Sequence, residues 1–144
     1  MSDVAGSTRP FSARVDASVL KRLERRGARS GTNKSRLAER YIDEGLRLDD
    51  HPGIVFRDGP TGRRAGLSGG PDVWEVVQVV LANHSGQRGV RAAAEWGRLS
   101  EREVRIAMRY YSEFPDEVEE RVRRNLDEAE AAEAAWRREQ AALG

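Results

Sequence analysis

Arginine and lysine residues near the start of the chain are the side chains best suited to bind a ligand. Residues 9–40 of the 144-residue sequence contain ten of them and only three acids, a local charge of +7 in a chain whose net charge is +1. Guanidinium and ammonium groups at this density favour phosphate, so the predicted partner is a polyanion such as nucleic acid. Residues 115–144 contain five arginines and nine acids, which predicts a different second partner. The alternative is that both segments are solvated helix faces.

No set of residues has the spacing expected of a catalytic or metal site. The two histidines are isolated from each other, and the sequence has no cysteine and no phosphate-binding loop of the G-x-x-x-x-G-K-[ST] type. His51 beside Asp49 and Asp50 has two interpretations, a weak metal site or a solvated turn between domains, and the turn is favoured. We therefore expect no enzymatic activity, no cofactor and no metal.

The sequence also carries information on where the protein is found. It has no apolar run long enough to span a membrane, and residues 1–10 lack the apolar centre of a signal peptide. The lack of cysteine is compatible with a reducing compartment. We expect a cytoplasmic protein, associated with the bacterial nucleoid when bound to DNA, and with no membrane partner.

A short strand is predicted before the first helix. Residues 8–15 alternate, with Phe11, Ala13 and Val15 on one side and Ser12 and Arg14 on the other. No second strand follows before the helix, and an unpaired strand leaves its backbone N–H and C=O groups without partners. The pairing strand must therefore come from a distant part of the chain or from a second copy of it.

Two helices are predicted after this strand. Asp16 is a good N-cap for the first helix, which should end near Gly31. The second helix should begin after Thr32 or Asn33 and end before Pro52. One face of the first helix carries Val19, Leu20, Leu23 and Gly27, and the predicted buried side of the second carries Leu37, Ala38, Tyr41, Ile42 and Gly45.

The remaining sequence predicts a hairpin and four helices. Residues 54–56 and the stretch RRAGL flank a DGPTG turn. An apolar helix starts at Pro71–Asp72, helices over residues 86–97 and 100–114 follow, and Ser100 with Glu103 forms a capping box. The last helix starts at Pro115, and its 4-3 apolar rhythm requires a groove or a partner helix. The predicted inner residues are Val73, Val76, Val77, Val80 and Leu81 on the first of these helices, and Val104, Ala107, Met108 and Tyr111 on the third.

Residues 8–48 follow the order strand, helix, turn, helix, in the stretches PFSARVDASVL and GTNKSRLAERYIDEGL. This order resembles the ribbon-helix-helix proteins, the Arc, MetJ and CopG type of DNA-binding dimer. The resemblance implies that two chains pair their strands into an antiparallel ribbon that enters the major groove. Pro10 departs from the family pattern because it offers a base only apolar contact. The implied base contacts are Pro10, Ser12 and Arg14, and the implied phosphate contacts are Arg9, Asn33, Lys34 and Ser35.

Residues 51–122 are similar to a second family, the small domains once catalogued only as domain of unknown function number four-three-three and now grouped with VapB-type antitoxins. The likeness rests on the glycine-bearing hairpin, the helix beginning PDVW, the L-S turn and an R-x-A-x-x-Y-Y helix. It implies a trihelical, helix-turn-helix-like fold and a protein toxin partner that resembles a PIN-type ribonuclease. The helical extension at the end of this chain departs from the family.

The predicted fold is mainly α, an intermolecular ribbon-helix-helix dimer followed by a hairpin, three helices and a long helix. The expected parts are a disordered arm (1–7), a DNA-binding and dimerisation domain (8–48), a hairpin plus helix-turn-helix-like domain (51–114) and an acidic C-terminal helix (115–144).

Two functional hypotheses follow. The first is the antitoxin of a type II toxin–antitoxin pair, a repressor that binds its own operator DNA as a dimer or a tetramer and neutralises a nuclease-like toxin through its C-terminal half. The second is a stand-alone transcription regulator or plasmid-partition protein with no toxin. The expected toxin interface is Val118, Val122, Leu126 and Trp136, and a second DNA-binding face would consist of Arg102, Arg105 and Arg109, for which an ion-paired, solvated helix face is the alternative.

Overall fold

The computed structural model describes residues 6–144 and divides into two compact units. The N-terminal unit extends to Asp43 and the C-terminal unit runs from Glu44 to Gly144. The boundary falls inside a continuous helix. The predicted disordered arm (1–7) falls mostly on residues 1–5, which lie outside the described residues.

The N-terminal unit is a pair of helices, α1 (Ala17–Ser30) and the first part of α2 (Lys34–Asp50). Asp16 caps α1 by accepting the backbone N–H of Ser18 at 2.8 Å, as the sequence predicted. Gly31 ends α1 in the left-handed conformation with φ of 66°, which glycine adopts without strain. Helix, turn and helix therefore begin and end where local signals place them.

Leu37 and Gly27 are the buried contact between these two helices. Leu37 of α2 is only 1% exposed. A Cβ on Gly27 would lie 2.9 Å from the backbone oxygen of Thr32 and 3.9 Å from Leu37. The small residue thus lets the end of α1 approach the turn closely.

Residues 7–16 form neither a helix nor a strand in this single chain, so the strand predicted at 8–15 is not formed within it. A strand is defined by backbone hydrogen bonds to a neighbouring strand, and no segment among the described residues pairs with this one. Pairing between two copies stays a prediction.

The C-terminal unit begins with the last turns of α2, from Glu44 to Asp50, and a two-stranded hairpin follows, as predicted. Strand β1 (Ile54–Arg57) pairs antiparallel with β2 (Arg64–Leu67), with Ile54 opposite Leu67 and Arg57 opposite Arg64. Buried Ile54 and Leu67 face the helices. The hairpin therefore supplies one wall of the core.

A buried carboxylate joins this hairpin to the first core helix. Asp72, which is 7% exposed, accepts hydrogen bonds from Arg57 at 2.8 Å and from Arg64. Arg57 also donates to the carbonyl oxygens of Leu67 and Gly70. Because the carboxylate and both guanidinium groups are largely shielded from water, each depends on the others for its hydrogen bonds.

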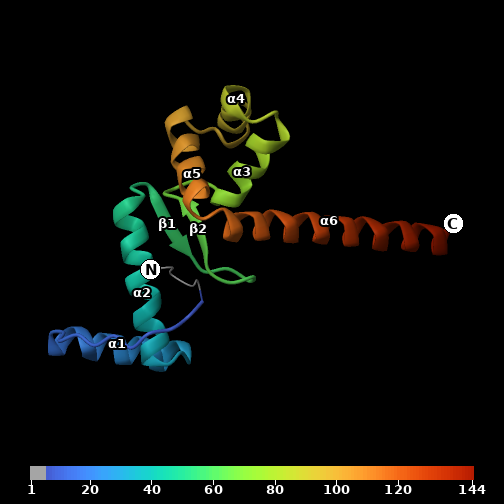
Figure 1. The fold of residues 1–144 in the computed structure, drawn as a ribbon. Helices are drawn as coiled ribbons and strands as arrows, with labels where there is room; N and C mark the ends of the chain where they lie inside the picture. Colours follow the sequence, from blue (N-terminus) through green and yellow to red (C-terminus); the bar gives the residue numbers. More distant parts are fainter. Residues whose placement is uncertain (1–5) are drawn as a thin grey trace. The chain divides into compact units, whose positions relative to one another are not determined.

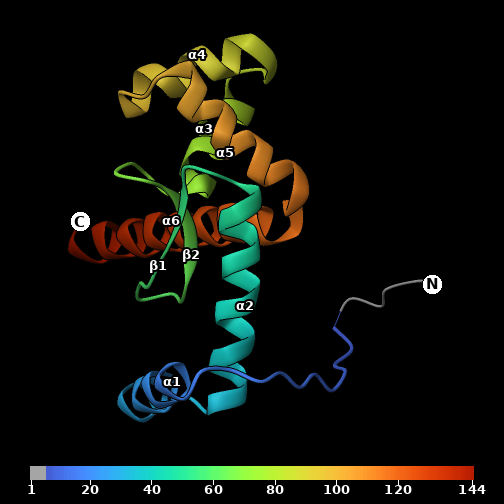
Figure 2. The same cartoon turned by 90° about the vertical axis from the view of Figure 1, so that its left-hand side faces the viewer.

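Three helices complete the core: α3 (Val73–Ala82), α4 (Gly86–Gly97) and α5 (Glu101–Glu113). In both views α3 lies between α4 and the last helix (Figures 1 and 2). A Cβ on Gly89 of α4 would lie 2.5 Å from the backbone oxygen of Val80, so α3 and α4 touch backbone to backbone. The buried core residues are Ile54, Ala65, Leu67, Val73, Val76, Val77, Val80, Val90, Ala93, Val104, Ala107, Tyr110 and Val118.

Helix α6 (Pro115–Leu143) is the longest element. Its first turns pack on α3 and α5 through buried Val118, and Arg121 donates to the carbonyl oxygen of Arg63 at 3.1 Å. From Leu126 onward every residue is exposed. The second half of α6 therefore extends from the C-terminal unit without tertiary support (Figure 1).

Several predicted inner residues lie elsewhere. Tyr41, Ile42 and Gly45 of α2 and Leu81 of α3 were expected to be buried, and all four are exposed. Periodicity identifies an apolar face, but burial also requires an element to cover it. On α5, Met108 and Tyr111 are only half-buried, whereas the neighbouring Tyr110, which was not predicted, is fully buried.

Candidate nucleic-acid and partner interfaces

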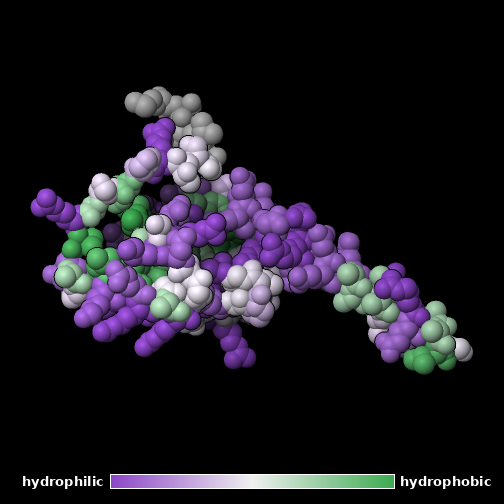
Figure 3. Space-filling view, turned by 90° about the horizontal axis from the view of Figure 1, so that it is seen from below, coloured by the Kyte–Doolittle hydropathy of each residue, from purple (hydrophilic) through white to green (hydrophobic). Residues whose placement is uncertain are grey.

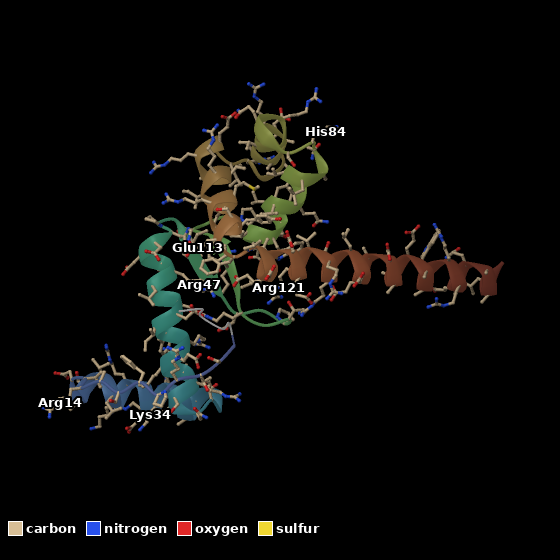
Figure 4. All side chains as sticks on the ribbon, viewed as in Figure 1. Arg14, Lys34, Arg47, His84, Glu113 and Arg121 are labelled. Atoms are coloured by element: carbon tan, nitrogen blue, oxygen red, sulfur yellow. The ribbon has the colours of Figure 1, made fainter. Side chains whose placement is uncertain are left out.

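The four residues predicted to contact DNA from the N-terminal segment are accessible. Arg9, Pro10, Ser12 and Arg14 are all exposed in the irregular stretch before α1, and Figure 4 shows Arg14 at the surface. None of them forms an ion pair with another described residue. The segment can therefore present these side chains to a ligand without first breaking internal contacts.

The predicted phosphate clamp lies at the first turn of α2. Asn33 is the N-cap, accepting the backbone N–H of Arg36 at 2.9 Å. Lys34 lies 3.8 Å from Glu24 with both side chains more than half exposed, and Ser35 is exposed. The Asn33 side-chain oxygen is thus engaged by the helix, which leaves Lys34, Ser35 and the first N–H groups of α2 for an anion.

The N-terminal unit exposes most of its large apolar side chains. Among residues 6–43 only Leu37 and Gly27 are buried, and Figure 3, which views the molecule from below, shows hydrophobic residues at the surface among hydrophilic ones. Singly exposed apolar residues are ordinary, but a set this large in a two-helix unit marks an interaction surface. This exposed apolar face, whose members are between 37% and 78% exposed, consists of Phe11, Val15, Val19, Leu20, Tyr41 and Ile42.

The three arginines predicted as a second DNA-binding face are all exposed on α5. Arg105 lies 3.7 Å from Glu101 and donates to Gln87 of α4 at 3.0 Å. Neither Arg102 nor Arg109 forms an ion pair with any described residue. The ion-paired alternative therefore applies to only one of the three.

The four residues of the predicted toxin interface on α6 differ in how exposed they are. Val118 belongs to the core and is not accessible, so its assignment to an interface was wrong; a 4-3 rhythm gives the same signal for a core contact and for a partner contact. Val122 is half-buried. Leu126 and Trp136 are about half exposed, at 49% and 59%, and they remain candidates for a partner contact.

Sequence reasoning missed a polar cluster at the end of α2. Arg47 donates to the Tyr110 hydroxyl at 2.8 Å and to Glu117 at 2.6 Å, and its guanidinium carbon lies 3.9 Å from the centre of the Phe114 ring. Tyr110 in turn donates to Glu117 at 2.6 Å. Burial, and then the hydrogen bond that the hydroxyl donates to the Glu117 carboxylate, raise the pKa of Tyr110 above the ordinary tyrosine range. No local signal could reveal a cluster assembled from three separate helices.

His51 belongs to the same region, and the prediction of a solvated turn was wrong. It is 4% exposed, its Nε2 lies 2.5 Å from an oxygen of Glu113, and its ring meets those of Tyr110 and Phe114 edge-on. Within the part of the chain that the structure describes, no cluster of three histidine or acidic side chains could hold a metal ion. His51 is thus a packed, hydrogen-bonded residue of the C-terminal unit.

Two further findings concern the chain as a whole. Among residues 6–144 no helix combines the length and apolar character needed to cross a bilayer. Comparisons with protein-family models, curated proteins and solved structures find no match.

Proposed function

We propose that the protein is a homodimeric DNA-binding antitoxin, which represses its own operator through the N-terminal unit and binds a toxin through α6. The observation that carries the proposal is the exposed apolar face of the N-terminal unit. A unit of about forty residues that buries one leucine and one glycine lacks the core that an independent fold requires. A second copy that covers this face would supply that core.

The basic composition beside this face supports a nucleic-acid ligand. If two copies of residues 8–15 pair antiparallel, Phe11 and Val15 turn toward the helices while Ser12 and Arg14 turn outward. A two-stranded ribbon fits the major groove, where arginine can pair bidentately with guanine. The first turn of α2 would then place Lys34 and Ser35 against the phosphate backbone.

The second half of α6 supports a protein partner. Every side chain of α6 from Leu126 onward is exposed, and Trp136 is the kind of large aromatic side chain that anchors interfaces. The acidic character of residues 115–144 suits a toxin with a basic nucleic-acid-binding cleft. The toxin class implied by the sequence resemblance, a PIN-type ribonuclease, is compatible with this chemistry.

The DNA-binding half of the proposal is tested with the Arg14→Ala variant and a duplex from the region upstream of the protein's own gene. Each copy of Arg14 in the dimer supplies one contact, so the variant should bind this duplex about 5- to 150-fold more weakly than the wild type for each bidentate base contact that is lost. Arg138→Ala, which removes an exposed arginine from α6, is the matched control and should bind normally. Equal affinity of both variants would remove the ribbon assignment.

The toxin-binding half is tested by co-expression with the protein encoded in the adjacent reading frame. A chain that ends at Asn125, the last half-buried residue of α6, should lose the rescue of growth but keep operator binding. If this shortened chain still rescues growth, α6 is not the toxin interface. An adjacent frame that encodes no toxic protein would instead favour the stand-alone regulator.

A further inference from the structure

A group of exposed, positively charged arginines lies on α4 and α5, outside the N-terminal unit and α6. Figure 4 shows many nitrogen-tipped side chains projecting from these two helices. All five members are exposed. This arginine surface consists of Arg88, Arg91, Arg102, Arg105 and Arg109.

Contacts between the two helices place Arg91 and Arg105 on one surface. Gln87 of α4 donates to both carboxylate oxygens of Glu101 of α5 at 3.2 Å and accepts from Arg105 at 3.0 Å. Arg91 of α4 lies 3.9 Å from the same carboxylate. The outward side of α4 thus lies next to the outward side of α5, and Arg109 extends the row by one turn beyond Arg105.

The arginine surface carries charge that internal pairing does not neutralise. Glu101 is within ion-pair distance of Arg91 and Arg105, but at 3.9 Å and 3.7 Å, with all three side chains at least 42% exposed. Pairs of this kind contribute little, because water and salt screen them. Arg88, Arg102 and Arg109 form no ion pair with any described residue.

We propose that the arginine surface of α4 and α5 is a second nucleic-acid-binding site, which contacts the phosphate backbone without reading base sequence. The inference rests on the proposed DNA-binding function and adds a surface to it. Exposed guanidinium groups spaced along two adjacent helices match a row of phosphates, to which arginine binds in bidentate fashion. The flexible, solvated side chains fix no base-reading geometry, so their contribution is electrostatic.

The test compares salt dependence. Binding of the full chain to the upstream duplex, and to a scrambled duplex of equal length, is measured by fluorescence anisotropy between 50 and 200 mM salt. The variant Arg102→Gln/Arg105→Gln/Arg109→Gln should bind both duplexes more weakly and by the same factor. For every three phosphate contacts that the variant loses, its affinity should fall about 40-fold less than that of the wild type over this salt range.

A charge-matched control excludes a general effect of lost positive charge. The variant Arg123→Gln/Arg137→Gln/Arg138→Gln removes three exposed arginines from α6 and should keep the wild-type salt dependence. The proposal is overturned if the α5 variant keeps it too, if both triple variants change it equally, or if the wild type binds neither duplex at low salt. Circular dichroism of each variant verifies that the helices are intact.

The outcome separates this proposal from the proposed function. If the α5 variant has normal salt dependence while Arg14→Ala loses preference for the upstream duplex, only the second site is refuted. If the α5 variant loses salt dependence while Arg14→Ala keeps that preference, the ribbon assignment falls and the arginine surface stands.

Discussion

Truncation of Phe11 should weaken dimerisation without changing the fold of the single chain. The Phe11 side chain is 78% exposed, so in an isolated chain its removal deletes almost no packing. In the proposed dimer this ring is covered by the second copy. Burial of a whole phenylalanine side chain contributes about 1.5–3 kcal/mol, and the part still exposed here corresponds to about 1–2 kcal/mol in each chain.

The effect counts twice in a symmetric dimer, because each copy loses the same ring. Phe11→Ala should therefore destabilise the dimer by about 2–4 kcal/mol, which raises its dissociation constant about 30- to 700-fold. Sedimentation equilibrium over a concentration series measures this constant. Helix content by circular dichroism at concentrations where both proteins are monomeric should be unchanged.

Leu143→Ala provides the matched control, since Leu143 is 75% exposed but lies at the end of α6. It should dimerise as the wild type does. The reasoning is refuted if the wild type remains monomeric at every concentration, or if Phe11→Ala and Leu143→Ala have the same dissociation constant as the wild type.

Three further predictions concern the C-terminal unit. Urea denaturation should show that Asp72→Ala lowers the free energy of unfolding by about 2–4 kcal/mol, because the change leaves two largely shielded guanidinium groups without their carboxylate. The same measurement should show little change for Glu120→Ala, whose carboxylate also meets two arginines but at the surface. Gly89→Ala should destabilise the folded protein by about 1–3 kcal/mol, because the added methyl group would overlap the backbone oxygen of Val80. Gly45→Ala, with open space around it, should stabilise the folded protein by about 0.5–1 kcal/mol. If the melting temperatures of the two variants move in the same direction, the packing of α3 on α4 is contradicted. Because folding raises the pKa of Tyr110, the contribution of this residue to stability is complete below the unfolded pKa of about 10 and falls by about 1.4 kcal/mol for each pH unit above that value. Urea titrations at about pH 10–12 should show that Tyr110→Phe lacks this pH dependence. An unchanged pH dependence in the variant would assign the effect to other groups.

The starts of the helices could be predicted because the signals are local. Helices begin one residue after Asp16 and one residue after Ser100, and a third begins at Pro115 itself. Capping depends on groups within three or four positions of the chain. The hairpin was predictable for the same reason, since a glycine-containing turn separates two short apolar runs.

Burial was less predictable because it depends on distant parts of the chain. The helical spacing on α5 predicted Tyr111, whereas the buried residue is Tyr110, which meets Arg47 from 63 positions away and the ring of Phe56 on the hairpin. Ile42 and Leu81 lie on apolar faces that the single chain leaves uncovered. Periodicity gives the direction of a side chain around its helix, whereas the covering surface is set by tertiary and quaternary contacts.

The candidate site was predictable in composition but not in extent. The basic segment and the arginines of α5 follow from charge counting, and Arg9, Arg14, Arg102, Arg105 and Arg109 are exposed. The contribution of α4 to the arginine surface was not foreseen, because it depends on the side-by-side placement of Gln87 and Glu101. The sequence does not reveal which faces of α4 and α5 adjoin, so it could not show that their charges lie on one surface.

The last two turns of α2 determine how the protein can be divided for separate study. Glu44 holds Arg63 of the hairpin through two hydrogen bonds of 2.6 and 2.7 Å, and Arg47 and His51 hold α5 and the start of α6. A fragment that began at Pro52, where composition suggests a linker, would remove Arg47 from the Tyr110 hydroxyl and Glu44 from the Arg63 guanidinium. A fragment that begins at Glu44 retains them, so limited proteolysis of the native protein should spare the LDDHPG stretch and cut α2 nearer its middle.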